Sequence, residues 1–390
     1  MVKPFLFART PKIIFGNGKI AELAGIAKSY GNDILLVTGA DSFIHSKHGE
    51  YLLNTFDMTG IHYHIVNINR EPSPEMVDLA VIRHQNDNIR LVIAIGGGSV
   101  IDAGKAISAM LNRSESVIEF LEGVGTKEHP GTKLPFIAVP TTSGTGSETT
   151  KNAVISQVGV GGFKKSLRHD NFVPDIAIID PELTLHCPPP ITAASGMDCF
   201  TQLVEAYLSN KPVPFTDALA YDGIAQLRIA LPRVWKWGED LEARSGMSYA
   251  ALVSGISLAN AGLGIVHGFA SSIGGMFNIP HGIVCGTLMA PANAITIKRL
   301  MELNESSPAL IKYAELGQLF SGEEQRSQDF YLSYFIDILI SWTDMMNIDR
   351  LSKYGVKSSD FENIIQLTEQ KNHPLKLSKE DLTKILESRL

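Results

Sequence analysis

The sequence predicts an α/β domain followed by an all-helical domain, and three observations support this fold class. Short apolar runs alternate with helical patterns in the first half, a proline cluster at Cys187–Ile191 ends the alternation, and the later segments have helical periodicity. Strands and helices in alternation are typical of a parallel sheet with helices on both faces. The 390 residues suffice for two domains with separate cores. We therefore assign residues 1–185 to the α/β domain and 186–390 to the helical domain.

The predicted strands are short, and several are apolar throughout. The run 91–95 has no polar residue, as expected for a strand that is covered on both faces. In order, we expect strands at 12–15, 34–38, 62–66, 91–95, 136–139 and 176–179. Helices are expected between them at 20–28, 48–56, 74–84 and 101–111, and after the proline cluster at 193–209, 214–231, 241–263, 266–276 and 283–300.

Composition excludes several classes of partner. The net charge is −7 and the chain has no run of Lys or Arg, so a nucleic-acid surface is not expected. The chain has no stretch of about 18 apolar residues, so no membrane span is expected. The apolar part of the first ten residues is too short for a signal peptide. The three cysteines, Cys187, Cys199 and Cys285, are an odd number at unrelated spacings, which favours a reducing compartment. We expect a cytoplasmic protein without nucleic-acid or membrane partners.

A glycine loop follows the fourth predicted strand. Gly96, Gly97 and Gly98 precede Ser99, which is expected to cap the next helix, and the helix N-terminus would present free N–H groups to a phosphate. The alternative is a tight turn without a ligand. The spacing matches neither the Walker loop nor the G-x-G-x-x-G fingerprint.

A second loop, VPTTSGTGSETT, follows the fifth predicted strand. It carries two glycines and a run of hydroxyl groups that includes Thr141, Thr142 and Thr145. Such a loop alone is commonly only a connection. Beside the glycine loop, at the carboxyl edge of the same sheet, it indicates the other side of a dinucleotide cleft.

Three polar side chains stand out in the helical domain. Asp198 lies on an apolar helix one turn before Gln202, and His267 and His281 each precede a glycine in apolar surroundings. Each has a structural explanation, since Asp198 could face the helix dipole and the histidines could be hydrogen-bonded core residues. One Asp with two His is also a common ligand set for a divalent cation.

The motifs resemble those of the iron-containing (group III) alcohol dehydrogenases. The resemblance covers about residues 10–295 and implies a dinucleotide-binding domain, a helical domain and a metal site between them. The matching segments, in family order, are GGGSVID (96–102) with Lys105, PTTSGTGSE (140–148), DPELT (180–184), GMD (196–198), GIVH (264–267) and PHG (280–282).

The resemblance implies a divalent metal, Fe²⁺ or Zn²⁺, held by Asp198, His267 and His281, which are also the expected catalytic residues. The family's fourth ligand, a histidine, falls on Gln202, whose amide is a weaker ligand than imidazole; it is expected to ligate the metal weakly or to contact substrate. Ser271 stands where many members have a histidine near the nicotinamide, and Asn152 falls at a substrate-facing position.

The resemblance also implies the contacts to NAD or NADP. Gly39 stands where NAD-preferring members often have an Asp that repels a 2′-phosphate, so NADP stays open, although Asp41 follows two residues on. The expected cofactor-binding residues are Gly39, Gly97, Gly98, Ser99, Asp102, Thr141, Thr142, Thr145 and Lys164.

The predicted function is a metal-dependent, NAD(P)-linked alcohol dehydrogenase, expected as a homodimer, acting on a small primary alcohol or aldehyde. Gln202 and Asn152 would make the pocket polar, which favours a polyhydroxylated substrate such as a sugar or sugar acid. Two alternatives are a lyase of the dehydroquinate-synthase type and a catalytically silent nucleotide-binding regulatory protein.

Overall fold

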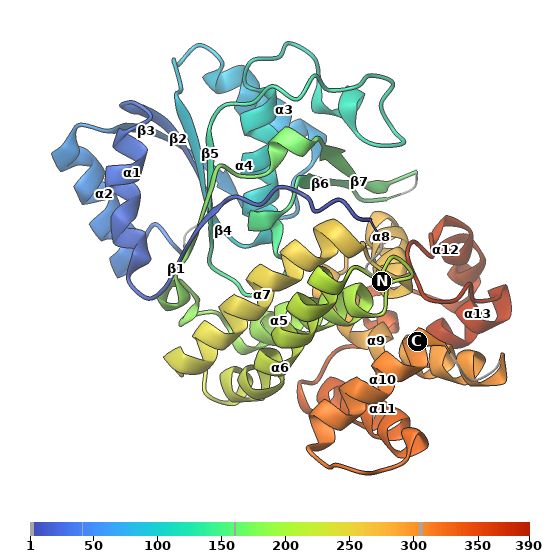
Figure 1. Ribbon diagram of the computed structural model, residues 1–390. Helices are drawn as coiled ribbons and strands as arrows, with labels where there is room; N and C mark the ends of the chain where they lie inside the picture. Colours follow the sequence, from blue (N-terminus) through green and yellow to red (C-terminus); the bar gives the residue numbers. More distant parts are fainter. Residues whose placement is uncertain (1–3, 41, 160, 304–306) are drawn as a thin grey trace.

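The computed structural model describes residues 4–40, 42–159, 161–303 and 307–390. An α/β half and a helical half lie one above the other (Figure 1). Six parallel strands form the sheet in the order β1-β8-β5-β4-β2-β3. Their bounds are β1 Lys12–Phe15, β2 Asp33–Gly39, β3 His62–Ile68, β4 Leu91–Gly96, β5 Phe136–Pro140 and β8 Ile176–Ile179. All six lie where the sequence predicted strands, which confirms the predicted α/β class.

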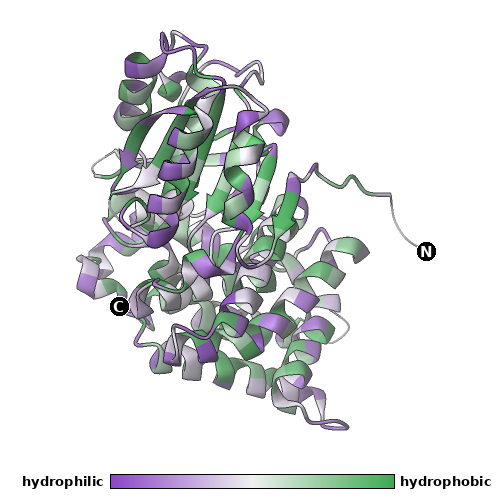
Figure 2. Cartoon of the chain, turned by 90° about the vertical axis from the view of Figure 1, so that its left-hand side faces the viewer, coloured by the Kyte–Doolittle hydropathy of each residue, from purple (hydrophilic) through white to green (hydrophobic). Residues whose placement is uncertain are grey.

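Alternate residues of the central strands pack against different helices. Val92 and Ala94 of β4 belong to a core shared with α3 (Pro74–His84) and α4 (Gly98–Met110), whereas Ile93 and Ile95 belong to a core shared with α1 (Leu23–Lys28) and α2 (Lys47–Thr59). Full burial of such a side chain stabilises the fold by about 1.5–3 kcal/mol. Figure 2 shows hydrophobic strands flanked by helices with hydrophilic outer faces.

The carboxyl ends of β2, β4 and β5 are level with one another. Thr38 is in register with Ile95, and Gly96 with Pro140, so Gly39 and the two predicted loops emerge side by side. From β2 the chain continues outward to β3 and then returns past β2 to β4, which makes the β2–β4 edge a topological switch point. Open parallel sheets bind ligands at such a crevice.

An antiparallel hairpin of β6 (Asn152–Gln157) and β7 (Phe163–Arg168) was not predicted from the sequence. Three of the six residues of β7 are Lys or Arg, so β7 has no apolar alternation that would indicate a strand. The hairpin lies outside the main sheet, and its apolar side, including Ala153 and Ile155, packs into the core beside α4.

The second half is helical, as predicted. Its helices are α5 Pro189–Tyr207, α6 Pro214–Lys236, α7 Leu241–Ala261, α8 Ile265–Met276, α9 His281–Glu302, α10 Pro308–Ser321, α11 Gln328–Met345, α12 Phe361–Leu367 and α13 Lys379–Glu387. Short 3₁₀ turns complete the chain at Lys19–Glu22, Val117–Phe120, Ser147–Thr149, Asp170–Phe172, Pro181–Thr184, Leu351–Tyr354 and Ser358–Asp360. α5 is buried from Gly196 to Tyr207 and is therefore central to this half.

The boundary predicted near residue 185 falls between the 3₁₀ turn at Pro181–Thr184 and α5. The two halves share packing there, because Leu252 and Ile256 of α7 contact Ala177 and Ile179 of β8. In the part of the chain that the structure describes, no single helix has the length and apolar character to cross a membrane. α7 and α8 meet both conditions only when they are taken together, and they are bent by 97°.

Candidate functional site

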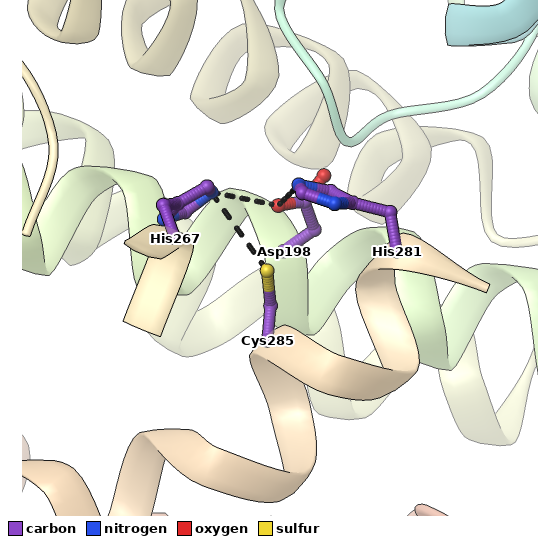
Figure 3. Close-up of side chains that lie close together, drawn as sticks. All are labelled: Asp198, His267, His281 and Cys285. Atoms are coloured by element: carbon purple, nitrogen blue, oxygen red, sulfur yellow. Dashed lines mark hydrogen bonds and ion pairs between the residues drawn. The ribbon is translucent and has the colours of Figure 1, made fainter. Parts of the chain in front are cut away.

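Four potential metal ligands converge from three helices of the second half. Asp198 comes from α5, His267 from the first turn of α8, and His281 and Cys285 from the first turns of α9 (Figure 3). Asp198 Oδ1 lies 3.2 Å from His267 Nε2 and 3.7 Å from His281 Nε2, and Cys285 Sγ lies 3.8 Å from His267 Nε2. One donor atom from each residue falls within 4.8 Å of the other three.

A buried carboxylate orients one of the imidazoles. Glu205 Oε2 accepts from His267 Nδ1 at 2.7 Å and from Gly264 N at 2.8 Å, and Oε1 accepts from Val266 N at 2.7 Å. Glu205 thus satisfies free N–H groups at the start of α8 and keeps the proton of His267 on Nδ1. His267 Nε2 faces Asp198 Oδ1 at 3.2 Å. Burial alone would lower the pKa of His267, but Cys285 and Glu205 outweigh it and hold that pKa well above its ordinary value. A metal ion at Nε2 would displace the proton held there, and a carboxylate behind the other ring nitrogen is the arrangement found around metal-ligating histidines.

Glycines let the helices that carry the histidines approach α5 closely. A Cβ at Gly264 would lie 2.8 Å from Glu205 Oε1, and one at Gly282 would lie 2.2 Å from the carbonyl oxygen of Ala194. Gly282, which follows His281, and Gly264, which precedes α8, therefore have a packing reason that is independent of any ligand.

The ionisation of the cluster suits a cation. Burial alone would raise the pKa of Asp198, but the neighbouring His281 and His267 outweigh it and hold that pKa below its ordinary value. Burial lowers the pKa of His281 to about 4 and raises the pKa of the Cys285 thiol to about 12. An ionised carboxylate and a neutral imidazole are the ligand forms that metals require, and a thiol releases its proton on binding. The donor set fits a divalent transition metal.

The glycine loop (96–99) and the second predicted loop (139–150), called the hydroxyl loop from here on, are packed against each other. A Cβ at Gly98 would lie 2.6 Å from Thr145 Cγ2, and one at Gly97 would lie 3.4 Å from Thr142 Oγ1. Thr141 N also donates to Gly96 O at 3.0 Å. The exposed edge of this pair of loops is formed by the half-buried residues Gly97, Gly98, Ser99, Thr141, Thr142 and Thr145.

The helix after the glycine loop begins earlier than predicted. Gly97 is its N-cap and Gly98 its first residue, so Ser99 lies inside the first turn and does not cap the helix; that prediction was wrong. The N–H groups of Gly98 and Ser99 open the helix and have no intrahelical acceptor, and glycine at the N-cap offers no side chain to bond them. This leaves them available to a diphosphate.

Asp102 is held by protein groups. Its carboxylate accepts a hydrogen bond from Ser147 Oγ and lies 4.0 Å from Lys105 Nζ. Lys105 is fully buried and donates to Ser147 O at 2.8 Å and Asn152 O at 2.6 Å. Burial lowers the pKa of Lys105 to about 8 and raises that of nearby Glu148 to about 7. Asp102 and Lys105 thus tie α4 to the hydroxyl loop.

Gln202 joins the helical half to the hydroxyl loop. Its Oε1 accepts from Ser254 Oγ at 2.8 Å, and its Nε2 donates to the carbonyl oxygen of Thr145 at 3.3 Å. Both ends of the amide therefore have protein partners, and Cys285 lies among the metal donors instead. α5 carries Asp198 and Gln202 one turn apart, so the donor cluster and the hydroxyl loop are neighbours.

The remaining predicted residues lie at a cavity and at the sheet edge. Asn152, Lys164 and Ser271 line a cavity of about 1090 Å³ between the β6–β7 hairpin, the end of α7, and α8. Lys164 pairs with Glu71, and Ser271 Oγ donates to His267 O at 2.9 Å. A Cβ at Gly39 would meet only Ser42 Oγ, at 3.9 Å. Asp41 lies outside the described residues.

Comparison with known families assigns the chain. Residues 10–181 match the family described as iron-containing alcohol dehydrogenase, and residues 192–390 match the C-terminal part of the Fe-containing alcohol dehydrogenase family. The chain belongs to the iron-containing alcohol dehydrogenase family. As a member, it is an oxidoreductase that acts on CH–OH groups, and the resemblance inferred from the motifs is confirmed.

Relatives and solved structures agree with this family. The chain is 30% identical over 385 residues to the NADPH-dependent butanol dehydrogenase of Clostridium saccharobutylicum, covering 96% of this chain and 95% of the relative. It is 32% identical to alcohol dehydrogenase 4 of Saccharomyces cerevisiae, covering 90% and 88%. The structure of an alcohol dehydrogenase from Oenococcus oeni matches with a TM-score of 0.87 at 27% identity, covering 99% and 100%. The family and the donor cluster support a nicotinamide nucleotide and a divalent metal as cofactors.

Two residues of the site escaped the sequence reasoning. Glu205 lies seven residues after Asp198, and Cys285 lies four residues after His281. Both spacings place the pair on one face of a helix, so the pattern was present in the sequence. The sequence could not show that these faces meet.

Proposed function

We propose that this iron-containing alcohol dehydrogenase interconverts a primary alcohol and its aldehyde, using a divalent metal and NAD or NADP. The observation that carries the proposal is the cluster of metal donors at Asp198, His267, His281 and Cys285. Asp198 lies one helical turn from Gln202, which bonds the hydroxyl loop at Thr145. A metal site and a nucleotide site that share a helix are suited to hydride transfer at a polarised CH–OH group.

The residues have separable tasks in this proposal. Asp198, His267 and His281 hold the metal, and the start of α4 with the hydroxyl loop binds the diphosphate. When bound, the metal acts as a Lewis acid on the substrate oxygen and the nicotinamide exchanges the hydride. Glu205 orients His267. The hydroxyl proton of Ser271 is committed to the carbonyl oxygen of His267, so this side chain does not take over a histidine proton relay.

For the nucleotide, we propose that both NAD and NADP are used. Gly39 ends β2 at the switch point with open space around it, and no carboxylate at that position repels a 2′-phosphate. Among the relatives, the butanol dehydrogenase is named as NADPH-dependent and a methanol dehydrogenase of Bacillus methanolicus as NAD-dependent.

For the substrate, we propose a small primary alcohol. The preference for a sugar or sugar acid rested on Gln202 and Asn152, and the amide of Gln202 has protein partners at both ends. Of these two residues, Asn152 lines the cavity and Gln202 is not among its lining residues. The homodimer and the cytoplasmic location stay predictions from the sequence.

A substrate panel tests the proposal. The purified enzyme is assayed with Zn²⁺, Fe²⁺ or Mn²⁺, with both cofactors, and with short alcohols, diols and sugar alcohols. We expect steady cofactor reduction by at least one primary alcohol, dependent on metal. Nucleotide binding without reduction of either cofactor would support the silent regulatory alternative, and substrate turnover without net cofactor reduction would support the lyase.

A further inference from the structure

Cys285 completes the donor cluster. Its side chain is fully buried, and it projects from α9 one turn after His281 on the same face (Figure 3). Its Sγ lies 3.8 Å from His267 Nε2. In a tetrahedral zinc site with Zn–S of about 2.3 Å and Zn–N of about 2.05 Å, sulfur and nitrogen are about 3.6 Å apart.

Two further donor separations agree with the same geometry. A carboxylate oxygen and an imidazole nitrogen on one zinc ion are about 3.4 Å apart. The two such separations at Asp198 Oδ1 are 3.2 Å to His267 and 3.7 Å to His281. All four donor atoms lie within 4.8 Å of one another, and the three separations above are ones that a single ion can span with small adjustments.

The position expected to supply the fourth ligand points elsewhere. Gln202 donates to the carbonyl oxygen of Thr145 and accepts from Ser254 Oγ, so its amide would have to abandon two hydrogen bonds to reach a metal. A thiolate is also a much better ligand for zinc than a neutral amide. Cys285 of α9 is thus placed to supply the fourth ligand that Gln202 of α5 does not supply.

We propose that Cys285 Sγ is the fourth protein ligand of the metal, in place of residue 202. This inference rests on the metal site of the proposed function. A purely apolar role for the thiol would not require it to face a carboxylate and two imidazoles. Because thiolate is a soft ligand, the site should favour zinc over ferrous iron.

Cobalt substitution of the whole enzyme tests the ligand directly. Chelator-treated protein is titrated with Co²⁺ without oxygen, and the near-ultraviolet sulfur-to-cobalt charge-transfer band is recorded with the bound stoichiometry. We expect one Co²⁺ per chain and a strong band. In Cys285→Ser the band should vanish, and Co²⁺ affinity should fall about a hundredfold or more, since even outer partners of a ligand contribute 10–100-fold.

Matched thiol variants show which sulfur is responsible. Cys187→Ser and Cys199→Ser should keep the band, and Gln202→Ala should leave Co²⁺ affinity nearly unchanged. X-ray absorption of the zinc-loaded wild type should show one sulfur at about 2.3 Å, a measurement that does not depend on any variant folding.

The outcomes separate the two proposals. One bound Co²⁺ per chain without a thiolate band, or with a band that survives Cys285→Ser, would overturn the role of Cys285 and leave the metal site standing. Absence of tight Co²⁺ binding in wild type, or unchanged binding in His267→Ala, would overturn the metal site itself.

Discussion

Glu205→Gln tests whether the buried carboxylate behind His267 governs the metal site. The substitution keeps the shape of the side chain but replaces one acceptor oxygen with an NH₂ group. In the native structure Oε2 faces two donors, Gly264 N and His267 Nδ1, and Oε1 faces Val266 N. Whichever way the amide turns, its NH₂ must face a backbone N–H, because each carboxylate oxygen accepts from one.

Both consequences weaken metal binding. If the amide NH₂ faces Val266 N, a buried donor is left unsatisfied at about 1–3 kcal/mol. If it faces His267 and Gly264 N, the Gly264 donor is left unsatisfied, and the imidazole accepts at Nδ1 and carries its proton on Nε2, where the metal should bind. We expect metal affinity to fall about 10–100-fold, as for other outer partners of metal ligands. A hundredfold change in affinity corresponds to about 2.7 kcal/mol.

The assay is zinc competition against a chromophoric chelator, with Tm of the metal-free protein measured in parallel. Asp381→Asn is the matched control, because Asp381 is also a buried carboxylate, bonded to Arg299 and Ser378 away from the cluster. It should lower Tm without changing zinc affinity. Zinc affinity of Glu205→Gln within threefold of wild type would refute the orienting role.

Four further changes probe the rest of the site. Gly98→Ala places a Cβ 2.6 Å from Thr145 Cγ2, so the two loops must separate, and calorimetry should show nucleotide affinity at least about tenfold weaker, as expected for overpacking of 1–3 kcal/mol. Wild-type kcat/KM should differ by less than about tenfold between NAD and NADP, and Gly39→Asp should shift it toward NAD; a thousandfold wild-type preference would contradict this. Burial raises the pKa of Glu148 to about 7, so the folded chain binds more protons than the unfolded chain between about pH 4.5 and 7. The free energy of unfolding should therefore fall as the pH rises through that window, by on the order of 3 kcal/mol relative to Glu148→Gln. The same dependence of unfolding free energy on pH in both proteins would count against it. Gln202→Ala should raise the KM for the nucleotide through loss of its bond to Thr145 while zinc affinity stays within about threefold, because one lost amide hydrogen bond contributes about 1 kcal/mol at the loop and none at the metal.

Much of the fold could be predicted from local patterns, and the exceptions have physical reasons. The four inner strands β2, β4, β5 and β8 are mostly apolar and buried on both faces, which makes them recognisable. The edge strands β1 and β3 are only partly buried and were recognised by their apolar and β-branched residues. The β6–β7 hairpin carries charged residues in β7 and packs only one side, so its pattern was too weak. Glycines at 159, 161 and 162 in its turn were the available signal.

The site divides in the same way. The loops at Gly96–Ser99 and Thr141–Thr145 are contiguous in sequence and could be recognised as motifs. Glu205 and Cys285 contact His267 only because α5, α8 and α9 pack together, and no local sequence pattern predicts that packing. Gln202 shows the converse case, because its position in the motif suggested a ligand, whereas its partners Ser254 and Thr145 come from other parts of the chain.

The hydroxyl loop is held to the helical half by a contact between two glycines. Gly146 has a φ of 62°, and a Cβ there would lie 2.4 Å from Gly255 Cα of α7, while a Cβ at Gly255 would lie 2.3 Å from Gly146 O. The loop belongs to the first half by sequence and packs against both halves. A chimera that joins the first half of this enzyme to the second half of a relative would therefore need glycine at both positions. The contact between Gly146 and Gly255 therefore limits which halves of family members can be combined, even where each half folds well.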